Sequence, residues 1–159
     1  MVRLSDLPAA ERAHLLAKSD PPLLDPRTGA TPFVPPVPLN TRRIALVTTA
    51  GLHLRGDDPF AMADASYRVL PGDASEHDFV MSHSSVNFDR TGFQQDLNLV
   101  FPLTRFRELV QDGVIAGLGR YHYSFMGALL TAEGYETSAT QLAGLLAADG
   151  VDTAFLTPV

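Results

Sequence analysis

The sequence predicts an α/β fold, a mostly parallel sheet flanked by helices, with an extended proline-rich N-terminal arm. Short apolar segments alternate with helix-like patterns from Arg43 onward. The segments at 43–51 and 78–83 run directly into small polar residues, which is typical of strands that end at the ligand-binding edge of a parallel sheet. More than half of the 12 prolines lie between residues 20 and 40, which excludes regular helix and central strand there.

The N-terminal part, residues 1–41, is expected to hold a helix followed by the arm. Ser5 to Lys18 has a partial apolar face, and Ser5 is placed to cap the first turn. The arm carries several large apolar side chains, so it can pack on its own domain or on a partner. A disordered linker is the alternative, and the sequence leaves both interpretations open.

Residues 42–159 are expected to form the α/β domain. Its first strand is predicted at 43–51, and two shorter strands follow at 65–72 and 78–83. A helix begins at Pro102, because the first helical turn needs no amide donor at that position, and Gly113 ends it.

The rest of this domain continues the alternation of strand and helix. Residues 114–118 form a small strand or turn, followed by the polar and aromatic loop "GRYHYSFMG". A second helix is predicted from Thr137 to Asp149, where Gly150 closes it, and residues 151–159 read as a final strand.

Composition excludes several classes of function. The formal net charge is −6, and the 12 basic residues are scattered, so the chain has no electrostatic footprint for nucleic acid. No apolar run approaches the roughly 20 residues of a membrane span, and no secretion signal is visible, so a cytoplasmic location is expected. The absence of cysteine excludes disulfides, thiolate metal sites and a thiol nucleophile within this chain.

The first polar cluster follows the strand at 43–51. Thr48, Thr49 and Gly51 combine hydroxyl groups with a flexible backbone, and the amides of such a turn can bind an anion such as a carboxylate. A tight turn from strand to loop explains the same residues without any ligand.

The second cluster lies at 82–90. His83 can act as a general acid or base because its pKa lies near neutrality. Asp89 can orient a histidine or bind a cation, and Arg90 can bind a carboxylate through two nitrogens. An Asx- and Ser-rich loop, in which Asp89 and Arg90 pair with each other and with the backbone, is the alternative.

The serines beside His83 are candidates to contact substrate or move protons. Ser84 and Ser85 have no G-x-S-x-G motif around them, so an acyl-transfer hydrolase is disfavoured. Asn87, Tyr121 and His122 are further candidates for substrate binding. A single histidine between tyrosines is more often a packed, hydrogen-bonded residue than a catalyst, and this is the alternative for His122.

The spacing of the histidines does not predict a metal site. His53, His83 and His122 can in principle converge with Asp89, but their spacing resembles neither H-E-x-x-H nor paired C-x-x-C motifs. We therefore predict no bound metal.

Several blocks together resemble one family, the glycine/sarcosine/betaine/D-proline reductase component B (selenoprotein B) family. The similarity extends from about Arg42 to Val159, and its most specific parts are FDRTGF, DLN-LVFP and HYSFMG. The other similar blocks are "RIALVTTAGLHL", "SYRVLPGD" and "LLAADGVDTAFLTPV".

The resemblance implies a reductase that cleaves a carbon–nitrogen bond beside a carboxylate or similar activating group. In this family a selenocysteine or cysteine of component B attacks the carbon, a pyruvoyl-bearing partner activates the amino group in the glycine-type enzymes, and a thiol system releases the product. In the family a Cys- or Sec-containing segment follows the strand that resembles "DTAFLTPV", and this sequence has neither residue.

Two interpretations of that difference remain. In the first, the chain is the substrate-side subunit of a heteromeric complex, and another polypeptide supplies the cysteine or selenocysteine as the thiol or selenol redox partner. In the second, the chain is a non-catalytic binding or scaffold subunit. Both predict an oligomer.

Overall fold

The structure is a computed structural model that describes residues 4–19, 35, 37–85, 90–128 and 132–159. The chain divides into two compact units, Met1–Pro36 and Val37–Val159. In the first unit, a 3-10 turn η1 (Leu4–Asp6) precedes helix α1 (Ala9–Ser19). The predicted cap at Ser5 is wrong, because the helical hydrogen bonds begin at Pro8, whose carbonyl accepts from the Arg12 amide at 2.9 Å. Most of the predicted proline-rich arm, at 20–34 and 36, lies outside the described residues.

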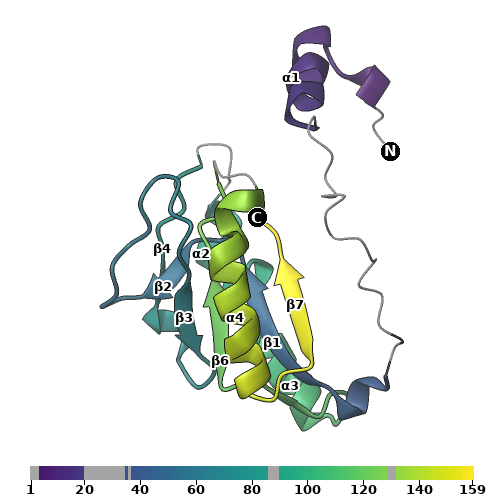
Figure 1. Cartoon of the computed structure of the whole chain (residues 1–159), viewed down its shortest axis with the longest axis vertical. Helices are drawn as coiled ribbons and strands as arrows, with labels where there is room; N and C mark the ends of the chain where they lie inside the picture. Colours follow the sequence, from purple (N-terminus) through teal and green to yellow (C-terminus); the bar gives the residue numbers. More distant parts are fainter. Residues whose placement is uncertain (1–3, 20–34, 36, 86–89, 129–131) are drawn as a thin grey trace. The chain divides into compact units, whose positions relative to one another are not determined.

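The second unit contains a largely parallel main sheet, which confirms the predicted fold class (Figure 1). Three strands run parallel to β1, two of them along one edge and the third along the other. A further strand, β3, lies beside β6 and runs antiparallel to it. The strands are β1 (Arg43–Thr48), β5 (Gly117–Leu118), β6 (Tyr121–Ser124), β7 (Thr153–Thr157) and β3 (Arg68–Pro71).

A small second sheet consists of β2 (Leu52–Leu54) and β4 (Phe79–Met81), which pair antiparallel. The sequence predicts β4 but not β2. Only three residues separate β1 from β2, so the two strands read as a single apolar run that turns at Gly51. Leu52 and His53 are both buried in this second strand.

Helices cover the two faces of the main sheet, α4 in front and α3 behind in Figure 1. The alternation of side chains along β1 explains this arrangement. Ile44 and Leu46 pack with Leu103 and Phe106 of α3, whereas Val47 packs in the cluster around Leu142 of α4. The helices of this unit are α2 (Thr91–Gln95), α3 (Leu103–Gln111) and α4 (Glu136–Ala148), with 3-10 turns η3 (Leu39–Thr41), η4 (Glu76–Asp78), η5 (Leu97–Leu99) and η6 (Ala132–Tyr135).

The predicted ends of the two long helices agree with the structure. Pro102 precedes the first residue of α3, and Gly113 adopts a φ of 69° just after it. Gly150 follows α4 with a φ of 70°. Both glycines occupy the left-handed conformation that commonly ends a helix.

Candidate functional site

Loops from several strands converge where the parallel strands end. The amide of Gly51 donates to the carbonyl of Phe125 at 2.8 Å, and the amide of Ser82 donates to the carbonyl of Gly51 at 2.9 Å. These bonds join the segments that follow β1, β6 and β4. We call this region the rim, and it consists of residues 48–51, 82–85, 124–127 and 157–159. Ligands of open parallel sheets bind at such an edge, so the rim is the candidate site.

Two glycines allow the rim loops to approach each other. A Cβ at Gly51 would lie 2.9 Å from the amide nitrogen of His83, and one at Gly127 would lie 2.5 Å from the Cβ of Thr49. Both glycines also have positive φ, 66° and 76°. The clusters predicted around Thr49 and His83 therefore belong to one rim, and glycine is required at both contacts.

The turn at 49–51 uses its amides within the protein. The amide of Thr49 donates to the carbonyl of Thr157 at 3.2 Å, and the amide of Ala50 donates to the Thr48 hydroxyl at 3.2 Å. The Gly51 amide bonds to Phe125, as described above. An anion could bind these amides only by displacing the hydrogen bonds that they already make. The hydroxyl groups of the turn are therefore better placed than its amides to bind a ligand.

The two threonine hydroxyls also make internal bonds. The buried Thr48 donates its hydroxyl to the carbonyl of Val100 at 2.8 Å, which ties the end of β1 to the segment before α3. The hydroxyl of Thr49 accepts from the amide of Val159 at 2.9 Å. Thr49 is only partly buried, so its hydroxyl is the more accessible of the two.

His83 is a buried residue of the rim, with 4% of its surface exposed. Its Nδ1 accepts from the amide of Ser85 at 3.1 Å, which places the proton of the neutral ring on Nε2. Burial, with a smaller contribution from the charge of Arg90, lowers the pKa of His83 below its ordinary value. The ring is therefore neutral at pH 7.

Arg90 holds the His83 loop from outside. Its Nη2 donates to the carbonyl oxygen of His83, although the side chain itself is exposed. The neighbouring Ser84 donates its hydroxyl to the sulfur of Met126 at 3.1 Å, and both Ser84 and Ser85 are partly buried. The structure thus brings His83, Ser84, Ser85 and Arg90 together. The predicted site residues Asn87 and Asp89 lie outside the described residues.

Tyr121 and His122 lie away from the rim. Tyr121 is at the amino end of β6, where it pairs with Pro71, three residues before the rim residue Ser124. His122 is fully buried, and its Nδ1 accepts from the amide of Leu46 at 3.1 Å. Burial, followed by the charge of Arg107, lowers the pKa of His122 to about 4. His122 therefore occupies the core as a neutral ring.

The rim contains further candidates that were not among the predicted site residues. Ser124 is buried and accepts from the amide of Leu52 at 2.8 Å, so it fixes the start of β2.

An apolar pocket of about 240 Å³ adjoins Thr49, and its other lining residues are Phe125, Gly127, Tyr135 and Ala139. Phe125 and Gly127 belong to the block "HYSFMG", and its glycine, three residues after the last residue of β6, was the available signal. Tyr135 and Ala139 are about ten residues farther along the chain, and no local pattern connects them to the rim.

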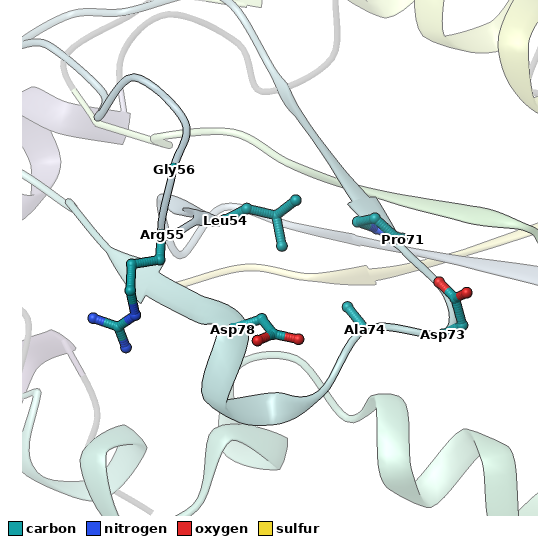
Figure 2. A pocket seen from close by; sticks show the side chains of 7 residues that line it. All are labelled: Leu54, Arg55, Gly56, Pro71, Asp73, Ala74 and Asp78. Carbon is teal, nitrogen blue, oxygen red and sulfur yellow. The ribbon is translucent and has the colours of Figure 1, made fainter.

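A hollow of about 540 Å³ lies at the other end of β6 (Figure 2). It adjoins Pro71, which pairs with Tyr121 at the amino end of that strand. The guanidinium of Arg55 is turned away from the carboxylates of Asp73 and Asp78. Asp78 accepts from the amide of Ser75 at 2.9 Å in a capping box, so its carboxylate has a structural role. We therefore place the candidate site at the rim.

Neither a metal centre nor a membrane-spanning helix is found in the part of the chain that the structure describes. Among these residues, no group of three or more His, Cys, Asp or Glu side chains is arranged to hold a metal ion. Their helices are also too short or too polar to cross a membrane.

The fold and the rim define an α/β protein whose candidate site is built from loops at the carboxyl ends of parallel strands. Comparison with known proteins identifies its family. The model of the family "Glycine/sarcosine/betaine reductase selenoprotein B (GRDB)" matches residues 26–159, and the chain belongs to this family. This finding confirms the resemblance seen in the sequence.

Sequence identity and coverage can be given for one curated relative. The chain is 36% identical over 121 residues to the D-proline reductase subunit gamma of Acetoanaerobium sticklandii. The match covers 75% of this chain and 49% of the relative, so the chain spans about half of the relative's length. No solved structure matches the chain.

Proposed function

We propose that this chain is the substrate-side subunit of a reductase complex of the glycine, sarcosine, betaine or D-proline type. The substrate is a small molecule with a carboxylate or similar activating group. The observation that carries this proposal is the convergence of the loops at 49–51, 82–85 and 125–127 on one rim, in a member of the GRDB family.

In this proposal, different rim residues bind different parts of the substrate. Arg90 is exposed and cationic, so it binds the substrate carboxylate or positions the loop that does. The apolar pocket beside Thr49 accepts the hydrocarbon part of the substrate. His83 is neutral and carries its proton on Nε2, so its role at the rim is that of a hydrogen-bond donor rather than a cation. Ser84 and Ser85 contact the substrate from the same loop.

The reaction itself needs a nucleophile that the 159 residues do not supply. The chain has no cysteine, whereas the family's chemistry uses a thiolate or selenolate as the reacting form. The relative is a subunit by name. We therefore propose that a Cys- or Sec-bearing partner subunit supplies the nucleophile, which attacks the carbon while the amine leaves.

A scaffold subunit is the second candidate function. The structure offers a specific observation in its favour, since the amides of Thr49, Ala50 and Gly51 are all engaged and His83 is buried. In this case the rim would hold the loops together for a partner without contacting a substrate.

Turnover by the co-purified complex distinguishes the two functions. We expect His83→Gln and Arg90→Ala to lower kcat/KM at least tenfold, because each removes a donor that contacts the substrate or holds its loop. The matched controls are His77→Gln and Arg105→Ala. His77 is exposed, and the exposed side chain of Arg105 forms a surface ion pair with Glu108 at 2.8 Å. Unchanged turnover in both rim variants, with the complex intact, would favour the scaffold.

A further inference from the structure

The strand β7 lies at an edge of the main sheet but has the sequence of an interior strand. It pairs with β1 along five residues, and no described strand lies on its other side. Exposed edges of natural sheets are usually protected by charges, prolines or bulges. The β7 sequence, TAFLT, contains none of these and instead resembles the apolar strands that helices and neighbours cover on both sides.

Two large apolar side chains of β7 are exposed, one on each face of the sheet. Phe155 packs on Phe106 of α3 with ring centroids 4.8 Å apart, yet 42% of its surface is exposed. Leu156, on the α4 face, is 67% exposed. The carbonyl of Thr157 accepts from the amide of Thr49, so the alternating backbone directs the amide groups of Ala154 and Leu156 to the outer edge.

The helix next to this edge is also unusual for a surface helix. In α4, ETSATQLAGLLAA, the only charged residue is Glu136, and Leu142 alone is buried. By contrast, α3 presents Arg105, Arg107 and Glu108 beside its apolar face. Figure 1 shows α4 lying across the sheet next to β7. In the second half of α4 the exposed residues are all apolar or glycine: Ala143, Gly144, Leu145, Ala147 and Ala148. An exposed apolar helix face is normally covered, so this part of α4 and β7 together point to a neighbour that covers both.

We infer that the outer edge of β7 and the adjoining surface of α4 bind a strand–helix segment of the proposed Cys- or Sec-bearing partner subunit, a segment related to the part of the D-proline reductase subunit gamma that lies outside the matched region. The inference rests on the proposed function, in which such a polypeptide completes the complex. Its strand extends the main sheet in parallel with β7 and hydrogen-bonds to Ala154 and Leu156. Its apolar side chains cover Phe155 and Leu156.

Two observations favour this occupant over a second copy of the chain. The relative is about twice as long as the stretch that this chain matches, because the match covers 49% of it, so the family provides a segment of sufficient size. The strands that pair with β1 are all parallel to it. A twofold pair of β7 strands would instead be antiparallel.

The test is association with a defined probe. The full chain is co-expressed with the part of the A. sticklandii D-proline reductase subunit gamma that lies outside the matched region. We expect a 1:1 complex in sedimentation velocity and at least tenfold slower hydrogen exchange at the β7 amides. Leu156→Lys should weaken the complex at least tenfold, because a charged lysine protects a sheet edge from pairing. Met62→Lys is the matched control, because Met62 is 74% exposed and lies outside β7 and α4.

Three results would overturn the inference. These are the absence of a complex with the unmodified chain, equal binding by Leu156→Lys and Met62→Lys, and a dimer of the chain alone that protects β7 and is lost in Leu156→Lys. The association assay requires no turnover. If the complex forms through β7 but His83→Gln leaves its turnover unchanged, the proposed role of His83 is refuted and the docking surface on β7 is not.

Discussion

At the scale of single residues, His122 shows how a side chain can replace a backbone acceptor in a sheet. Its Nδ1 accepts from the amide of Leu46 in the interval between β5 and β6. The ring also packs edge-on against Phe101, with centroids 5.8 Å apart. Protonation of Nδ1 would break the bond to Leu46 and place a charge in the core, so the neutral ring is part of the folded structure.

This role predicts a pH dependence of stability. The folded-state pKa of His122, about 4, lies below its ordinary value of 6.5. Between these values the unfolded chain binds the extra proton, so the free energy of unfolding falls as the pH decreases from 6.5 toward 4. The contribution of His122 is at most about 3 kcal/mol over this range.

Denaturant unfolding at pH 7, 6 and 5 measures the effect. We expect His122→Gln to be less stable than the unmodified chain at pH 7 but to lose less stability on acidification. His77→Gln provides the control, because it removes an imidazole from an exposed position. A slope that is identical in all three proteins would show that His122 does not titrate with unfolding.

At the scale of elements, the turns after strands and helices use glycine for different reasons. Gly113, after α3, has a φ of 69° and open space around it. Gly127, after β6, has a similar φ of 76° but lies against Thr49. At Gly113, glycine is needed only for the positive φ. At Gly127, it is needed for the positive φ and also for the close contact between two rim loops.

These two positions separate conformational cost from steric cost. We expect Gly113→Ala to destabilise the chain by about 1 kcal/mol, because alanine disfavours positive φ. Gly127→Ala should cost at least about 1 kcal/mol more, because its Cβ would lie 2.5 Å from the Cβ of Thr49 and the loops would have to move apart. Urea unfolding of both variants tests this difference, and equal losses would mean that the rim is less tightly packed than the structure indicates.

The elements also show which part of the fold local patterns can predict. Both long helices, β1 and β7 follow from apolar periodicity and from terminal Pro or Gly residues. The strand β2 could not be predicted, since three residues are too few for a periodic signal and its pairing with β4 is non-local. The antiparallel direction of β3 likewise depends on its distant partner β6.

At the scale of the whole molecule, sequence reasoning found part of the rim because polar residues after strands of a parallel sheet gather at one edge. It brought Thr49, Gly51 and His83 into one site on that basis. For His122 it left two interpretations open, substrate binding and a packed, hydrogen-bonded position, and the burial of the ring agrees with the second. Local sequence could not choose between them, because alternation along β6 depends on which helix covers which face. Nor could it connect the rim to Tyr135, which lies farther along the chain and packs on Phe125 in the folded structure.

The rim pocket is a property of this global packing, and filling it tests the substrate assignment. Ala139 of α4 is exposed at the mouth of the pocket, so Ala139→Leu should narrow it without disturbing the core. We expect KM of the complex to rise at least tenfold while kcat changes little, because the substituted side chain excludes the hydrocarbon part of the substrate but does not touch the reacting groups. Ala148→Leu, exposed at the other end of the same helix, is the control. Because both substitutions add the same volume to α4, a shared effect on KM would point to the helix surface, and an unchanged KM in Ala139→Leu would place the substrate elsewhere.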